Sequence, residues 1–73
     1  MIRILFTELM AEKSRNVGRR ISNEEVARAT GIHRTTLTKI ADPRGHNVRT
    51  DIVDKLCNYF EVPVEKILLH IPD

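Results

Sequence analysis

Apolar residues recur at helical spacing in the first part of the chain. Ile2, Leu5 and Leu9 are separated by three and four residues, which places them on one side of a helix. A helix from Ile2 to about Ser14 is therefore predicted. The following stretch, Ser14–Arg20, contains arginines and the turn-forming residues Asn and Gly, so we expect a basic loop there.

A second helix is marked at both of its ends. Ser22, followed three residues later by Glu25, has the spacing of a capping box. Ile21 before the cap and Val26 inside the helix have the spacing of a hydrophobic staple. Gly31 suits the left-handed residue that commonly ends a helix. These features predict a helix that begins at the Ser22 cap and ends before Gly31.

A third short helix is predicted from about Arg34 to Ala41. Leu37 and Ile40 supply a buried side, and the other side is polar. Threonine is a poor helix former because its branched carbon restricts rotamers, so a helix with three threonines suggests that these side chains make contacts. The polar positions are Arg34, Thr35, Thr36, Thr38 and Lys39.

The remainder of the chain predicts two further helices. Residues 42–47 include Pro and Gly and are expected to form a loop. A fourth helix is expected near Thr50 as its cap, and Pro63 suits the first turn of a fifth. The predicted fold class is all-α, with five short helices in one domain spanning residues 1–73.

Length and composition restrict the function. A chain of 73 residues with 41% hydrophobic and 30% charged residues makes a soluble domain with a small core and no deep cleft. It has no paired nucleophile and base, no glycine-rich phosphate loop and no metal-ligand cluster, so we expect no enzyme, metal or cofactor. Cys57 is the only cysteine, which indicates a reducing, cytoplasmic setting. Neither a signal peptide nor a membrane span is expected.

The net charge of +2 conceals an uneven distribution. Between Lys13 and Arg49 there are nine basic and three acidic residues, a net charge of +6. Residues 50–73 carry two basic and five acidic residues, a net charge of −3. A basic middle between acidic ends suggests a face that binds a polyanion, although the same charges would also solvate an ordinary surface.

The second and third predicted helices have the pattern of a helix-turn-helix. Ala27 is small enough to face a closely packed helix, Gly31 permits the turn, and Leu37 fills the wedge between the two helices. This stretch resembles the Cro and phage-repressor-like (XRE) helix-turn-helix DNA-binding family. The segments 53–60 and 64–73 resemble the last two helices of that family, so the resemblance covers nearly the whole chain. It implies a λ-repressor-like fold with the third helix in the major groove of double-stranded DNA.

The resemblance also implies roles for individual residues. Arg34, Thr35 and Lys39 occupy base-reading positions, and Thr36 and Thr38 would contact thymine methyl groups or phosphate oxygens. Asn23 stands where many members have a phosphate-binding glutamine, and Asp42 stands where an asparagine often binds phosphate, so a carboxylate there would repel it. His33 replaces the usual serine cap, which predicts a weaker cap and either a phosphate contact or an exposed position. The candidate phosphate contacts are Asn23, His33, Arg15, Arg19, Arg20 and Arg44.

The function that the resemblance implies is a transcriptional regulator, expected to be a repressor of phage or mobile-element type. Such domains usually bind as homodimers, and Leu69 and Ile71 are the candidate dimer patch. The cytoplasm of a prokaryotic cell is the expected location, for a chain of bacterial or phage origin. The alternative is an antitoxin that binds a toxin partner and its own operator, although no inhibitory tail is evident. RNA binding would suit the charge, but no aromatic stacking platform is visible.

Overall fold

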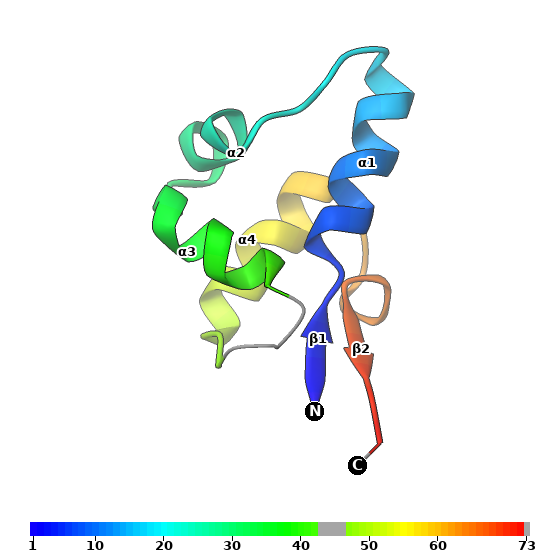
Figure 1. Cartoon of the computed structure of the whole chain (residues 1–73), viewed down its shortest axis with the longest axis vertical. Helices are drawn as coiled ribbons and strands as arrows, with labels where there is room; N and C mark the ends of the chain where they lie inside the picture. Colours follow the sequence, from blue (N-terminus) through cyan, green and yellow to red (C-terminus); the bar gives the residue numbers. More distant parts are fainter. Residues whose placement is uncertain (43–46, 73) are drawn as a thin grey trace.

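The computed structural model describes residues 1–42 and 47–72. Within these residues the chain is mostly helical, in agreement with the predicted all-α class. Figure 1 shows the elements in chain order. They are β1 (Ile2–Ile4), α1 (Phe6–Val17), α2 (Asn23–Thr30), α3 (Arg34–Ala41), α4 (Thr50–Phe60), the 3-10 turn η1 (Val64–Lys66) and β2 (Leu68–His70).

The prediction that the first helix begins at Ile2 is wrong, because Ile2–Ile4 is a strand. β1 pairs antiparallel with β2, with Ile2 opposite His70 and Ile4 opposite Leu68. The two strands lie side by side and lead away from the helices, and both chain ends lie beyond them (Figure 1). We call this pair of strands the β1–β2 ribbon. Three residues are too few to show the alternation that distinguishes a strand from a helix in sequence.

α1 also extends beyond its predicted end. It runs to Val17 and stops at Gly18, which adopts a left-handed conformation with φ of 75°. The Ser14 hydroxyl donates a hydrogen bond to the Met10 carbonyl at 2.8 Å. The predicted basic loop Ser14–Arg20 is thus wrong in its first half, which is the last turn of the helix.

The predicted fifth helix is wrong as well. Pro63 does start a helical turn, but that turn is the 3-10 segment Val64–Lys66. The residues that follow are extended because they pair with β1. α4 differs only at its start, where the cap position is Arg49 and Thr50 is already helical. α2 and α3 begin and end where the sequence predicted.

The core contains at least one buried side chain from β1 and from each of the helices α1 to α4. Phe6, Leu37, Leu56 and Ile67 are among its largest fully buried members. Phe6 meets Phe60 edge-on, with ring centroids 6.0 Å apart. This packing holds α3 against the body by one side only. No helix in the part of the chain that the structure describes is long and apolar enough to cross a membrane.

Candidate nucleic-acid interface

α3 divides its side chains between the core and the solvent. Leu37 and Ile40 are buried and hold the helix in place. The predicted base-reading residues occupy the remaining positions, where Thr36 is half-buried and the others are exposed: Arg34, Thr35, Thr38 and Lys39. A short helix with one polar, open side has the shape that the major groove accommodates.

The turn between α2 and α3 is held by three hydrogen bonds. Gly31 has φ of 78°, and its N–H donates to the Ala27 carbonyl at 2.8 Å. The Thr30 hydroxyl donates to the Val26 carbonyl at 2.7 Å and accepts from the Ile32 N–H at 3.2 Å. Val26 before the turn and Ile32 and Leu37 after it are buried. The angle between the two helices is therefore set by the turn as well as by packing, and the helix-turn-helix prediction for this stretch agrees with the structure.

His33 caps α3 with its imidazole ring. Its Nδ1 atom accepts a hydrogen bond from the Thr35 N–H at 3.1 Å. A helix N-terminus has N–H groups without partners in the helix, and the ring supplies one acceptor. A weaker cap was expected unless another group replaced the serine, and in the structure the histidine ring does so.

Arg34, at the start of α3, forms an ion pair with the start of α2. Its Nη1 atom lies 2.9 Å from Oε1 of Glu24, and the two side chains are 65% and 64% exposed. Glu24 was not singled out from the sequence as part of the site. The partners are ten positions apart in the sequence and belong to two different helices, so only the tertiary structure brings them together.

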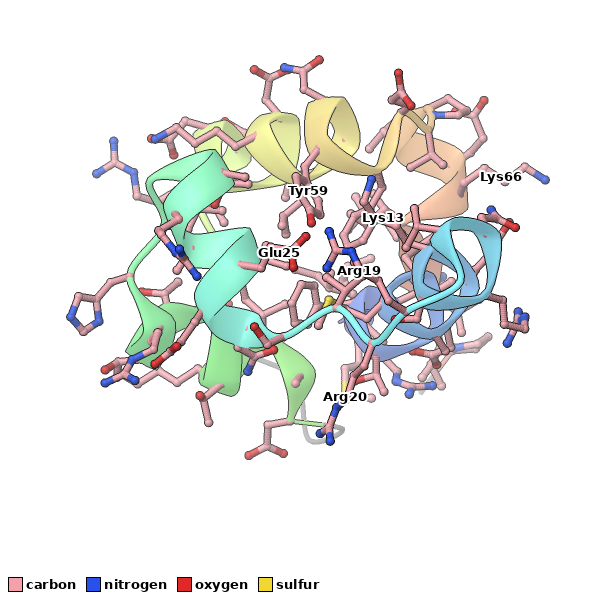
Figure 2. All side chains as sticks on the ribbon, turned by 90° about the horizontal axis from the view of Figure 1, so that it is seen from above. Lys13, Arg19, Arg20, Glu25, Tyr59 and Lys66 are labelled. Carbon is pink, nitrogen blue, oxygen red and sulfur yellow. The ribbon has the colours of Figure 1, made fainter. Side chains whose placement is uncertain are left out.

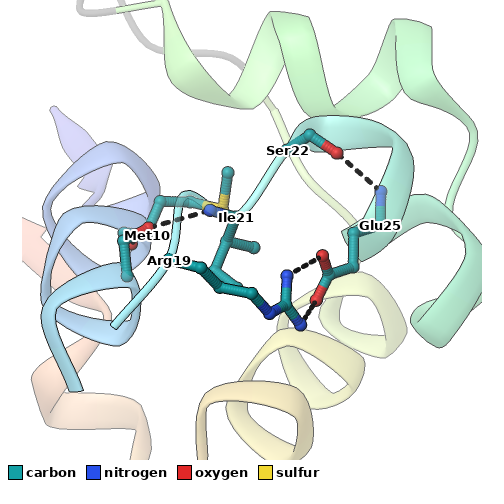
Figure 3. Close-up of polar contacts among 6 residues, drawn as sticks. Met10, Arg19, Ile21, Ser22 and Glu25 are labelled. Carbon is teal, nitrogen blue, oxygen red and sulfur yellow. Dashed lines mark hydrogen bonds and ion pairs between the residues drawn. The ribbon is translucent and has the colours of Figure 1, made fainter. Parts of the chain in front are cut away.

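A second ion pair joins the end of α1 to α2. The Arg19 guanidinium donates two hydrogen bonds to the Glu25 carboxylate, at 2.7 and 2.9 Å (Figure 3). Ser22 accepts from the Glu25 N–H at 3.2 Å, as a capping box requires. The Glu25 side chain pairs with Arg19 instead of returning to the Ser22 backbone, so only half of the predicted capping box forms. The Ile21 N–H donates to the Ser14 hydroxyl at 3.0 Å, which ties the same segment to α1.

The contacts of this pair shift the pKa values of its two members and of the neighbouring Tyr59. Hydrogen bonding from Arg19 lowers the pKa of Glu25, and the same contact raises the pKa of Arg19. Burial, followed by the charge of Glu25, raises the pKa of Tyr59. Lys13 Nζ lies 4.7 Å from the centre of the Tyr59 ring. Figure 2 shows these four side chains directed toward the space between α1, α2 and α4.

The candidate phosphate contacts are spread over several elements. Asn23 is the first residue of α2 and is half-buried, and Arg15 is exposed on α1. Arg20 is exposed and points away from the Arg19–Glu25 pair (Figure 2). Arg19 is exposed, but its guanidinium is engaged by Glu25. Arg44 lies outside the described residues, as does most of the expected 42–47 loop.

A hollow between α3 and the start of α4 adds one basic residue to the site. Thr36, Lys39 and Ile40 line it from α3, and Asn47, Val48, Arg49 and Ile52 line it from the other side. The Arg49 side chain is 84% exposed and its Nε lies 3.1 Å from Asp51 Oδ1. Arg49 belongs to the basic segment of the sequence but was not among the predicted site residues. An arginine immediately before the expected Thr50 cap was the available signal.

Two groups with other chemistry lie elsewhere. Cys57 packs partly buried against the core, and burial raises the pKa of its thiol. At neutral pH the thiol is therefore protonated, which is unsuited to nucleophilic attack. Among residues 1–42 and 47–72, no three His, Cys, Asp or Glu side chains gather as a metal site would require.

Comparison with known families agrees with the geometry of α2 and α3. A family model described as a Cro/C1-type HTH DNA-binding domain matches residues 7–73. No curated protein matches the chain. The matched segment contains α2, α3 and α4 and all of α1 except its first residue, and it covers nearly the whole sequence. The chain belongs to the Cro/C1-type helix-turn-helix DNA-binding domain family.

Proposed function

We propose that this protein is a sequence-specific transcriptional repressor of phage or mobile-element type that reads the major groove with α3. The observation that carries the proposal is the open polar side of α3. Arg34, Thr35 and Lys39 are exposed there, while Leu37 and Ile40 hold the helix by its other side. Arg34 supports guanine reading best, because a guanidinium can pair with O6 and N7 together.

In this proposal, contacts to phosphates position the protein on the duplex. The candidates among the described residues are Asn23, His33, Arg15, Arg19 and Arg20, although Glu25 engages the guanidinium of Arg19. Arg49 joins them because it lines the hollow beside Lys39. Such contacts set affinity and orientation without reading sequence. Arg44 stays a candidate from the sequence alone.

A homodimer is the form in which one short recognition helix reads enough bases. Two copies would place their α3 helices on half-sites about 34–36 Å apart, one turn of the duplex. Apolar exposure along the β1–β2 ribbon supports a contact there. Met1, Ile2 and Leu69 are 45%, 51% and 42% exposed. Ile71, the other residue of the predicted dimer patch, is less exposed, because it is half-buried.

The test is selection of bound sequences from random duplex DNA. The wild-type chain is expected to select one sequence family. Arg34→Ala should remove the preference at one base pair, at a cost of about 1–3 kcal/mol on the selected site, with binding to unrelated DNA largely retained. Thr35→Ala should alter a neighbouring position.

Lys66→Ala is the matched control, because Lys66 is an exposed basic residue on η1, on the opposite side of the molecule from α2 in the view of Figure 2. It should leave the selected sequence unchanged. Failure of the wild-type chain to enrich any sequence would overturn sequence-specific binding. Uniform weakening by Arg34→Ala on every duplex would instead assign Arg34 to the phosphates.

A further inference from the structure

The pair formed by Glu24 and Arg34 lies at the N-terminal end of the proposed reading surface on α3. Glu24 is in the first turn of α2, and Arg34 is the first residue of α3. Their side chains are joined by one hydrogen bond, from Nη1 to Oε1 at 2.9 Å. Both side chains are about two-thirds exposed, so the pair is formed in solvent, where DNA would have access to it.

This contact leaves most of the guanidinium free to bind. An arginine carries five N–H donors in a planar fork, and Glu24 accepts from Nη1 alone. Within residues 1–42 and 47–72, the side chain of Arg34 donates to no other group. Pairing with guanine O6 and N7 needs two donors. The ion pair and guanine reading are therefore compatible on one side chain.

We propose that Glu24 is a positioning residue that determines specificity, because it holds Arg34 for base reading and reduces the attraction of Arg34 to phosphate. The inference rests on the proposed role of Arg34. Phosphates are present at every sequence, so an unpaired arginine at this position would add to binding on all DNA. A carboxylate beside it offsets that charge on every duplex, whereas the two hydrogen bonds to guanine are gained only at the right sequence.

The size of the effect follows from the exposure of the pair. Exposed ion pairs contribute little, so we expect Glu24→Gln to raise affinity for random duplex about two- to fivefold. The log–log salt dependence on random duplex should steepen by about 0.9, the value for one more neutralised phosphate. Affinity for the selected site should rise less, which lowers the ratio of selected-site to random-duplex affinity.

Glu65→Gln is the matched control, because it removes the same charge from an exposed glutamate on η1. It should change both affinities by the same small factor and leave their ratio unchanged. If Glu24→Gln behaved like Glu65→Gln, net charge alone would account for the result and the proposal would be overturned.

The decisive measurement is a double-mutant cycle of Glu24→Gln and Arg34→Ala on both duplexes. If Glu24 acts through Arg34, the effect of Glu24→Gln on the affinity ratio disappears in the Arg34→Ala background. An equal effect in both backgrounds would overturn the proposal while leaving base reading by Arg34 intact. Conversely, an Arg34→Ala chain that still selects the wild-type sequence would overturn the proposed role of Arg34 and, with it, this inference.

Discussion

The Glu25 carboxylate connects the end of α1 to the start of the helix-turn-helix. It accepts two hydrogen bonds from the Arg19 guanidinium, at 2.7 and 2.9 Å. Charge-assisted bidentate pairs of this kind are stronger and more directional than neutral hydrogen bonds. The Ser22 N–H is the partner that the capping-box spacing offered, and the guanidinium takes its place. The pair thus ties the segment between α1 and α2 to the first turn of α2.

This contact predicts a pH-dependent contribution to stability. The pKa of Glu25 is lowered from 4.5 in the folded state, so the pair stabilises the fold fully above the unfolded pKa. That contribution is lost as the pH falls through the lower, folded pKa. Glu25→Gln should remove this part of the pH dependence of the free energy of unfolding, measured by urea titration from pH 7 to pH 3.

The control for that titration is Glu12→Gln, which removes an exposed carboxylate from α1. Its curve should still show the fall in stability that Glu25 causes in the wild type as the pH decreases. A Glu25→Gln curve that runs parallel to the wild type would contradict the stabilising role of the pair.

His33 gives a second prediction about single residues. Its ring accepts the Thr35 N–H at 3.1 Å, as a serine cap would. His33→Ala should lower the free energy of unfolding by about 0.5–2 kcal/mol, the usual loss for removing a cap side chain. His33→Ser should retain the stability, since serine is a preferred cap. Urea unfolding at pH 7 measures both, and an alanine variant as stable as the wild type would show that the ring does not cap α3.

α2 was predicted well because both of its ends carry local signals. Ser22 and Gly31 mark the ends of α2 by side-chain capping and by a positive φ, both of which depend on neighbouring residues only. The strands carry no such signal, because Ile2 pairs with His70 from the other end of the chain. The spacing of Ile2, Leu5 and Leu9 fits a helix, and only the partner strand makes the extended conformation of Ile2 favourable.

The same distinction holds within the site. The exposed side of α3 could be predicted, because Leu37 and Ile40 define its buried side. The ion pairs could not, since each joins residues of different elements that the fold brings into contact. Arg34 meets Glu24 across the turn, and Arg19 competes for Glu25. Helical periodicity contains no information about either contact.

Gly31 allows a test of how the turn between α2 and α3 is stabilised. Its φ is 78°, and an added Cβ would meet no atom within 4 Å. The cost of Gly31→Ala should therefore come from backbone strain alone, about 1–2 kcal/mol for an L-residue in this region. Gly31→Asn should cost less, because asparagine tolerates the left-handed region better. Urea unfolding distinguishes the two, and a loss well above 2 kcal/mol for alanine would indicate a steric clash that the structure does not contain.

The salt dependence of DNA binding belongs to the whole molecule, because it reflects the number of phosphates that all of its basic residues neutralise together. Arg20 is exposed and points away from Glu25, the carboxylate that pairs with Arg19 (Figure 2). Arg20→Ala should reduce the log–log salt slope by about 0.9, the value for one phosphate contact. Arg19→Ala should reduce it less, because Glu25 already neutralises that guanidinium. Binding to random duplex from 50 to 200 mM salt measures both slopes, and equal reductions would contradict the distinction.

Assembly on DNA provides the last prediction. Leu69 is 42% exposed on the β1–β2 ribbon, which leads away from the helices (Figure 1). If two copies meet there, Leu69→Ser should weaken binding to a duplex with two half-sites and leave binding to a single half-site unchanged. The substitution should change the stability of the monomer little, because the side chain is exposed.

Val64→Ser is the matched control, since Val64 is 49% exposed but lies on η1, outside the ribbon. It should bind both duplexes like the wild type. Sedimentation of each chain with the two-half-site duplex gives the number of copies bound, and titration gives their cooperativity. A second copy adds the contacts of a second α3 to the same duplex, so loss of dimerisation should appear as lost cooperativity rather than as lost base preference. Equal cooperativity in Leu69→Ser and the wild type would place the dimer contact away from Leu69.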